Sequence, residues 1–296
     1  ATTGEKAPIF HKLHAAKHRR NIPTMGGLVI IVAVVIVTLI FNLSRSQTYL
    51  PLAILVSAGL VGLLDDWINI RGNGAGVAGL RSRLKFALIF GVALFGALYF
   101  YFKLGYNLIH IPAVGDFSIG WLYVPLFVLV VVATANAVNI TDGLDGLSGG
   151  LLASSYAAFG AIAYFQESYG IAAFCATIVG VMLTYTWFNI YPARFFMGDS
   201  GAFALGTTLG AIAVLTNAVL VLPIIGLVFV LEAGSSSIQI LSKKIFKRKI
   251  FLSAPVHHHF EAKGWPETKV TMRFWVIGQI SAVIGLIIGL LGNRAL

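Results

Sequence analysis

The sequence predicts an all-α polytopic membrane protein. Of its 296 residues, 58% are hydrophobic and only 11% are charged, whereas soluble globular domains are about 25% charged. The apolar runs are continuous rather than alternating, and they are rich in Gly, Ala, Ser and Thr, which permit close packing of helices in lipid. These features favour helices over a transmembrane barrel. We therefore expect residues 1–296 to form a single helical domain.

Nine apolar runs come close to the roughly 20 residues that a helix needs to cross a bilayer. The seventh and eighth almost touch at Asn217, so the boundary between them is the least defined. The nine runs cover residues 26–43, 49–64, 84–102, 121–138, 147–165, 171–191, 201–217, 218–241 and 272–292.

Lys and Arg residues are distributed unequally between the two sets of loops. If residues 1–25 are cytoplasmic, all of the 21 basic residues except Arg45, Lys103 and Arg294 fall on the cytoplasmic side. By the positive-inside rule, this bias predicts that residues 1–25 and the other loops rich in Lys and Arg face the cytoplasm. The net charge of +10 then reports topology, and we expect no nucleic-acid partner.

Two connecting segments have patterns of their own. Residues 103–120 contain LIHIPAVGDFSIG, two short β-favouring runs around a Val-Gly-Asp turn, which predicts a small extracytoplasmic β-hairpin. Residues 242–271 begin with KKIFKRKIFL, a mixture of cationic and apolar residues that suits either a membrane surface or a solvated basic loop. Cys175, the only cysteine, lies in an apolar run, so we expect it to serve packing.

The first candidate site is the pair Asp65-Asp66 at the end of an apolar run. Adjacent carboxylates repel each other and are costly beside lipid, so an opposing cation or metal is expected nearby. The alternative is an ordinary polar helix end at the membrane interface.

The second is NAVNITDGLDGLSGG, residues 136–150. A helical course would place Asn136, Asn139 and Asp142 on one face, with Asp145 three residues further on. The glycines allow the backbone to approach a ligand closely. A polar turn between two helices is the alternative, but such a turn does not need two Asn residues in the preceding apolar stretch.

The third is YPARFFMGDSGAFALG, residues 191–206, in which Asp199 immediately precedes an apolar run. Asp199 and Ser200 could simply cap that helix. A glycine-flanked helix N-terminus also suits a phosphate, and an Asp there could hold the magnesium that a phosphate brings.

The fourth is PVHHHFE, residues 255–261. Three consecutive His cannot all face one zinc ion from a helix or strand, which disfavours a zinc site. His can instead donate to phosphate oxygens or move protons, and a surface His cluster is the alternative. Glu232 lies inside an apolar run with Gln239 on the same helical face; it is either functional or a buried acid bonded to a neighbouring helix.

Together, these groups suit a reaction of phosphate esters at the membrane surface. NAVNITDGLDGL, FMGDSG and PVHHHFE, with IPTMGG and the Asp65-Asp66 pair, resemble the phospho-N-acetylmuramoyl-pentapeptide transferase family of the polyprenyl-phosphate sugar-1-phosphate transferase superfamily. The resemblance runs from about Lys17 to near the end of the chain. It implies ten transmembrane helices with the active site on the cytoplasmic face. The nine apolar runs look like these ten helices without the first one.

The resemblance implies transfer of phospho-N-acetylmuramoyl-pentapeptide from UDP-N-acetylmuramoyl-pentapeptide to undecaprenyl phosphate, which gives lipid I and UMP. This Mg²⁺-dependent step would belong to peptidoglycan synthesis at the bacterial inner membrane. The resemblance also implies that the protein can form a homodimer. The sequence departs from the family pattern at three places, which concern loop contacts. Ile22 stands where the family usually has Thr, Asn69 stands where Lys is common, and GDSGA replaces GDTGS.

Residue roles follow from the same motif matches. Asp199 would bind magnesium, Asp65 and Asp66 would face the lipid phosphate and the metal, and Asn189 would assist the diphosphate. The uridine pocket would consist of Gly143, Leu144, Asp145 and Phe196, with Phe196 stacking on uracil. His257 and His258 would contact the substrate and belong to the catalytic set with the three Asp residues. The remaining substrate contacts would come from His259, Asn136, Asp142 and Gln239, with Lys17 and Lys85 as phosphate cations.

Three other functions remain open at this point. A sister enzyme would transfer N-acetylglucosamine 1-phosphate in the same chemistry. A secondary transporter would need acids near the bilayer midplane and repeated halves, whereas these acids gather at one face. A structural protein of a wall-building complex would have no turnover. For the transferase, direct attack by the lipid phosphate competes with covalent catalysis by Asp65 or Asp66.

Overall fold

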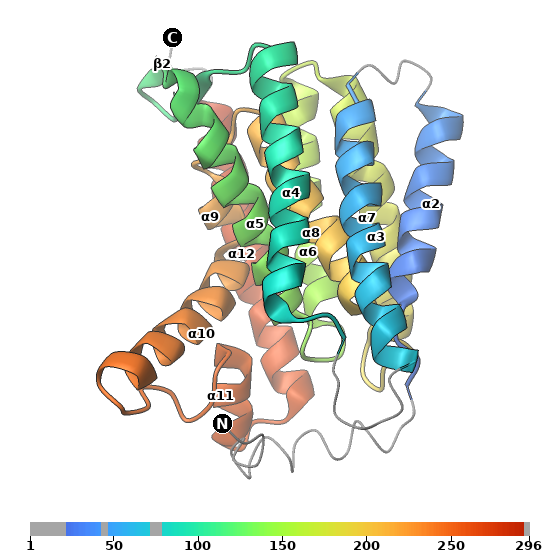
Figure 1. Cartoon of the computed structure of the whole chain (residues 1–296), viewed down its shortest axis with the longest axis vertical. Coiled ribbons are helices and arrows are strands. Elements are labelled where there is room, and N and C mark those ends of the chain that lie inside the picture. The colour runs from blue at the N-terminus through green and yellow to red at the C-terminus, as the bar shows by residue number, and fades with distance from the viewer. Residues whose placement is uncertain (1–21, 43–46, 72–78, 293–296) are drawn as a thin grey trace.

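The computed structural model describes residues 22–42, 47–71 and 79–292. It is a bundle of long helices with one small hairpin (Figure 1). The helices are α2 (Gly26–Phe41), α3 (Tyr49–Arg71), α4 (Ser82–Leu98) with the π-helical turn η1 (Tyr99–Lys103), the 3-10 turn η2 (Gly120–Leu122), α5 (Tyr123–Thr141), α6 (Leu147–Phe165), α7 (Tyr169–Asn189), α8 (Gly198–Leu215), α9 (Leu222–Ile225), α10 (Leu227–Ile245), α11 (Val256–Ala262) and α12 (Glu267–Gly292).

The prediction of a polytopic helical membrane protein is confirmed. Within the described ranges, six helical segments are long and apolar enough to cross a membrane, and α2 is a shorter apolar helix. Helix α6 coincides with the predicted run 147–165. The six segments are Tyr49–Arg71, Ser82–Lys103, Gly120–Thr141, Tyr169–Asn189, Gly198–Leu215 and Glu267–Gly292.

The run 218–241 does not form the single continuous helix that its composition predicts. It contains the short helix α9, a break at Gly226 and the first part of α10. Pro223 lies in the first turn of α9, where a missing N–H is tolerated, and Gly226 ends that helix. The chain therefore changes direction, and α10 runs outward from the bundle (Figure 1).

Helix α8 forms the centre of the bundle. Every residue from Ser200 to Val214 is buried, and α8 packs most extensively against α3 and α5. Glycines permit these approaches: a Cβ on Gly62 of α3 would lie 2.3 Å from the carbonyl oxygen of Asp199, and one on Gly27 of α2 would lie 2.0 Å from the amide nitrogen of Gly201.

The two ends of the bundle differ in structure. At one end, which we call the hairpin end, β1 (Leu108–Ile111) pairs antiparallel with β2 (Gly115–Ser118), as predicted. The Asn217 side chain accepts a hydrogen bond from the His110 amide and so fastens the hairpin to the turn after α8. The last turn of α3 and the start of α8 lie at the opposite end, which we call the acidic end (Figure 1).

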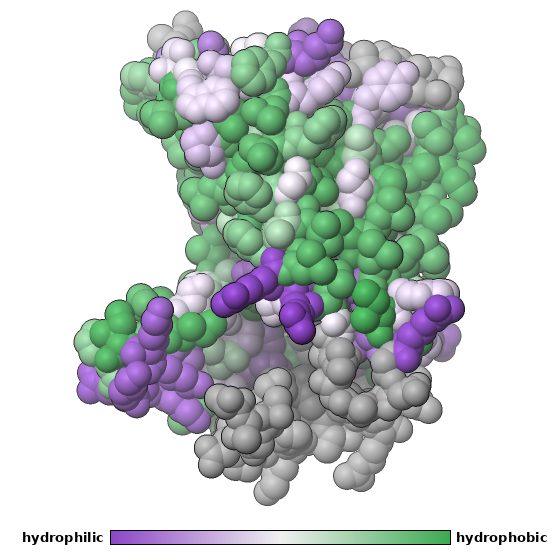
Figure 2. Space-filling model, viewed as in Figure 1, coloured by the Kyte–Doolittle hydropathy of each residue, from purple (hydrophilic) through white to green (hydrophobic). Residues whose placement is uncertain are grey.

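The surface agrees with a membrane location. Figure 2 shows a broad hydrophobic belt across the middle of the molecule. Hydrophilic residues gather on an outward projection that we call the α10 arm, residues 238–252. The arm exposes apolar side chains such as Ile240 and Phe246 alongside Lys243, Lys244 and Lys247. This mixture is typical of a segment at a membrane surface.

Gly62→Ala should destabilise the protein by about 1–3 kcal/mol, because the added methyl group meets backbone atoms of α8 that cannot move aside. Gly91→Ala is the matched control on α4, since a Cβ there has no atom within 4 Å. Thermal unfolding in detergent should separate the two variants. Equal melting temperatures would contradict the close packing of α3 and α8.

Candidate active site

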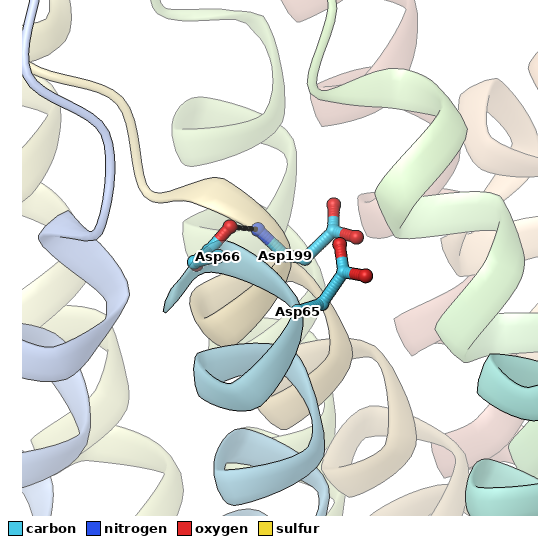
Figure 3. Close-up of side chains that lie close together, drawn as sticks. All are labelled: Asp65, Asp66 and Asp199. Carbon is cyan, nitrogen blue, oxygen red and sulfur yellow. Dashed lines mark hydrogen bonds between the residues drawn. The ribbon is translucent and has the colours of Figure 1, made fainter. Parts of the chain in front are cut away.

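Three carboxylates from two helices meet at the acidic end. Asp65 and Asp66 lie in the last turns of α3, and Asp199 lies at the start of α8 (Figure 3). One oxygen from each carboxylate lies within 4.8 Å of the others, and Asp65 and Asp66 are buried. Such a group of hard oxygen donors is suited to a divalent cation.

Asp66 binds the N-terminus of α8. Its two carboxylate oxygens accept hydrogen bonds from the backbone amides of Asp199 (3.1 Å) and Ser200 (3.0 Å). These amides have no partner within their own helix, and the positive end of the helix dipole favours a carboxylate there. Asp66 therefore acts as a cap supplied by another helix and fixes the position of Asp199.

Lys85 of α4 neutralises the other two carboxylates. Its Nζ lies 2.7 Å from Asp65 Oδ2 and 2.7 Å from Asp199 Oδ2. Asn139 of α5 donates to the other oxygen of Asp199 at 2.8 Å. The cation that the sequence predicts beside the Asp pair is thus a side chain of the protein. The Lys85 side chain is 25% exposed, so a ligand can reach it.

A cavity of about 360 Å³, lined by both polar and apolar side chains, opens next to this cluster. Lys85 and Ser82 of α4 and Asn136 and Asn139 of α5 contribute its polar side chains. Asn136 is exposed and one helical turn before Asn139, which places both on one face of α5, as their spacing predicts. The cavity is large enough for a phosphate group held by these side chains.

The loop 142–146 lies beyond the end of α5 and is fixed by buried polar contacts. Asn189, fully buried at the end of α7, accepts a hydrogen bond from the Gly146 amide and donates one to the Phe195 carbonyl. Asp145 accepts from the Ala193 amide, and Asp142 accepts from Ser148. Leu144 packs in the core. Asn189 thus joins the loop 142–146 to the segment that carries Phe196.

Helix α12 supports the same loop, which the sequence analysis did not foresee. Glu267 accepts a hydrogen bond from the Asp145 amide, Thr271 donates to the Asp145 carbonyl and Trp275 donates to the Gly146 carbonyl. These three residues recur every four positions and so share one face of a helix. The four-residue spacing of these side chains at the start of an apolar run is the sequence signal that could have identified them as one interacting face.

The three His residues have separate environments. Nδ1 of His257 lies 2.8 Å from Glu232 of α10, and both side chains are buried. Nδ1 of His258 lies 2.6 Å from Glu261, and both residues belong to the short helix α11. His259 accepts a hydrogen bond from the Leu252 amide at Nδ1. Loss of hydration, together with nearby Lys263, lowers the pKa of His259, which agrees with a neutral ring that accepts at this nitrogen.

Gln239 has a different environment from the acidic cluster. Its side chain accepts hydrogen bonds from the Ile250 and Phe251 amides and donates one to the Phe251 carbonyl. These hydrogen bonds fix the turn within the α10 arm. The backbone of Phe196 pairs with Pro23 and Gly26, which links IPTMGG to the start of α8. Lys17 lies outside the described residues.

The chain is similar in sequence to known proteins. A family model described as glycosyl transferase family 4 matches residues 48–217, from the start of α3 to the turn after α8. A phospho-N-acetylmuramoyl-pentapeptide-transferase of Chloroflexus aurantiacus is 42% identical over 283 residues, which cover 91% of this chain and 77% of that protein. The enzyme of the same name from Geobacillus kaustophilus is 42% identical over 296 residues, 96% of this chain and 87% of the relative.

The chain belongs to the phospho-N-acetylmuramoyl-pentapeptide transferase family. Membership in this transferase family makes the chain a multi-pass bacterial membrane protein with transferase activity. The resemblance that the motifs indicate is confirmed. The segment that matches the glycosyl transferase family 4 model contains Asp65, Asp66, Lys85 and Asp199, whereas His257, His258 and His259 lie beyond it.

Asn189→Leu should destabilise this member of the transferase family by about 2–4 kcal/mol, because the Gly146 amide and the Phe195 carbonyl would both lose a partner in a buried place. Thr184→Ala is the matched control on α7, since Thr184 bonds only to a carbonyl of its own helix. Thermal unfolding in detergent tests both. A small effect from Asn189→Leu would mean that the loop is held by other contacts.

Proposed function

We propose that this chain transfers phospho-N-acetylmuramoyl-pentapeptide from UDP-N-acetylmuramoyl-pentapeptide to undecaprenyl phosphate, with release of UMP and formation of lipid I. The main support is the convergence of Asp65, Asp66, Asp199 and Lys85 at the N-terminus of α8. The name of the relatives and the PVHHHFE motif favour the muramoyl substrate over N-acetylglucosamine. We also propose that the whole chain works as one domain.

Magnesium suits this site by the chemistry of its donors. Asp199 and Asp65 offer carboxylate oxygens whose spacing fits one hard cation, while Asp66 remains bound to α8. When bound there, magnesium would neutralise charge on the diphosphate of the substrate and on the leaving UMP. Lys85 already bridges the two carboxylates, so we propose that the ammonium group turns toward a phosphate oxygen when the cation is present.

The residue contacts support direct attack by the lipid phosphate. An oxygen of undecaprenyl phosphate forms a bond to the sugar-bearing phosphorus, and the bond from that phosphorus to the oxygen of UMP breaks. A phosphate monoester has a second pKa near about 6, so much of it is dianionic at pH 7 and needs no general base. Asp66 is a poor nucleophile because both of its oxygens accept amide hydrogen bonds. The oxygens of Asp65 accept from Leu80 and Lys85.

The remaining residues supply binding surfaces in this proposal. Gly143, Leu144 and Asp145 with Phe196 would form the uridine pocket, which Asn189 and α12 hold together. Lys85, Asn136 and Asn139 would face the diphosphate. The described basic residues other than Lys103 lie in segments that the positive-inside rule assigns to the acidic end, so we propose that this end faces the cytoplasm.

An apolar cavity offers a place for the polyprenyl chain. It measures about 430 Å³ and lies between α5, the α9 segment and the start of α10, with Ala133, Leu209, Phe229 and Gly234 among its lining residues. Leu129 and Val230, also in its lining, are exposed on the lateral surface. Figure 2 shows an indentation of the molecular outline above the α10 arm. A lipid chain could therefore enter from the side.

A homodimer remains a prediction from the family resemblance. The exposed apolar residues of α12, such as Val276 and Ile280, suit a second copy and lipid equally well. The mass of the protein–detergent complex would decide between them.

Asp199→Asn should lower turnover about 1,000-fold, because removal of one metal-binding carboxylate costs several kcal/mol of charge stabilisation in the transition state. UMP release is measured with undecaprenyl phosphate, magnesium and either the muramoyl-pentapeptide or the N-acetylglucosamine nucleotide. Asp116→Asn at the hairpin end is the control. Electron paramagnetic resonance of Mn²⁺ should show binding to the wild type and much weaker binding to Asp199→Asn.

Release from the N-acetylglucosamine nucleotide alone would move the chain to the sister activity. Absence of release from both nucleotides, in protein that melts like the active relatives, would overturn the proposed function. Unchanged Mn²⁺ binding by Asp199→Asn would overturn the metal assignment alone.

Ala133→Phe should raise the KM for undecaprenyl phosphate about tenfold and leave the KM for the nucleotide unchanged. A phenyl group in the cavity displaces about two methylene groups of the lipid, at a cost of about 1.5 kcal/mol. The control is Ala173→Phe, which fills another apolar cavity between α6 and α7. Equal effects of both variants would argue against this route for the lipid.

A further inference from the structure

Glu232 is a carboxylate in an unusual environment. It lies on α10 as the one charged residue of the apolar run 218–241, and its side chain is 0% exposed. A buried carboxylate is retained only with a hydrogen-bonding or charged partner. Its partner is Nδ1 of His257, 2.8 Å from Oε2, while Oε1 has no hydrogen-bond partner in the described structure.

The contact fixes the chemistry of the imidazole. An ionised carboxylate can only accept a hydrogen bond, so beside ionised Glu232 the Nδ1 atom of His257 carries the proton. The second nitrogen, Nε2, is then the remaining polar atom of the ring. A buried carboxylate that holds a His in this way sets both the tautomer and the orientation of the ring.

The ring edge opposite Glu232 faces the loop that contains the candidate uridine pocket. A Cβ added to Gly143 would lie 2.5 Å from His257 Nε2 and 3.0 Å from Cε1. Gly143 thus leaves room for the ring where any other residue would displace it. Nε2 is buried and has no hydrogen-bond partner among the described residues. Such an atom in a native structure calls for an explanation, such as a partner supplied in another state of the protein.

We propose that Glu232 is a positioning residue, which keeps the proton of His257 on Nδ1 and directs Nε2 at the loop 142–146, where a donor of the bound nucleotide substrate or of the loop closing on it completes the contact. The inference rests on the proposed function. Glu232 does not touch the substrate and acts through His257.

The neighbouring His provides a comparison within the same helix. His258 stacks edge-on against His257, with ring centroids 4.1 Å apart, and has its own carboxylate in Glu261. That carboxylate lies three residues away on the same short helix. Glu232, in contrast, reaches His257 from α10, which also lines the apolar cavity. The Glu232 contact therefore links the two candidate substrate-binding regions.

The kinetic test is a double-mutant cycle on UMP release. Glu232→Gln keeps the size of the side chain, but an amide can donate as well as accept and so no longer fixes the tautomer. We expect a loss of about 10- to 100-fold in kcat/KM, with partial recovery in Glu232→Asp. In the His257→Ala background, Glu232→Gln should change kcat/KM by less than about threefold, because residues that act as a unit are not additive.

The control and the contrary outcomes are defined by the same helix. Ser235→Ala removes a buried hydroxyl on α10 that bonds only within that helix, and it should stay within about twofold of the wild type. The proposal is overturned if Glu232→Gln also stays within twofold, or if its loss multiplies with that of His257→Ala, as a purely structural role requires.

A second measurement does not depend on turnover. Nitrogen-15 NMR of labelled His residues, with the His257 signals assigned by their loss in His257→Ala, should show a single Nδ1-protonated tautomer in the wild type. Glu232→Gln should give a mixture of tautomers. A mixture in the wild type would overturn the inference. Inactivity of the wild type with both nucleotides would instead count against the proposed function.

Discussion

The bond between Asp66 and the first amides of α8 is the constraint on which the rest of the site depends. It satisfies amides that α8 cannot satisfy itself and provides a buried carboxylate with the positive end of a helix. Because Asp65 is the next residue of the same turn, anchoring Asp66 also directs Asp65 toward Asp199. Glycines at the contact between α3 and α8 allow the two backbones to come this close. The packing of α3 against α8 and the placement of the carboxylates therefore depend on the same contact.

Charge compensation at the acidic end comes from several helices. Two carboxylates from α3 and one from α8 face Lys85 from α4 and Asn139 from α5. Removing any one of these side chains would leave a charge or a polar group with too few partners, which is costly where water is scarce. The loop 142–146 is built in the same way, from α7 and α12. The site thus exists only when the whole bundle is assembled.

Much of this could be predicted from the sequence, because a bilayer imposes simple rules. Continuous apolar runs predicted the helices and a Val-Gly-Asp turn predicted the hairpin. The position of acids at the ends of apolar runs singled out Asp65, Asp66 and Asp199 as candidates. The break at Gly226 was not predicted, because hydropathy does not register a change of direction between two apolar segments. The expectation for Gln239 was a substrate contact. Its observed backbone partners in the α10 arm depend on a turn that no local pattern indicates.

The contributions of Glu267, Thr271 and Trp275 show a further limit of sequence reasoning. Their periodicity places them on one helical face, but it does not say which loop that face meets. Long-range partners of this kind depend on how α12 docks beside α6. Glu232 is similar: its burial could be expected from its apolar surroundings, whereas its partner on α11 lies 25 residues away.

The lateral cavity between α5 and α10 has a consequence for how this protein meets its surroundings. A ligand that enters through exposed residues such as Leu129 and Val230 arrives from the bilayer, without passing through water. Its supply is set by its mole fraction among the other lipids, and adding inert lipid or detergent dilutes it even when its molar amount is constant. By this route the protein would meet its lipid substrate in the two-dimensional bilayer and its nucleotide substrate in three-dimensional solution.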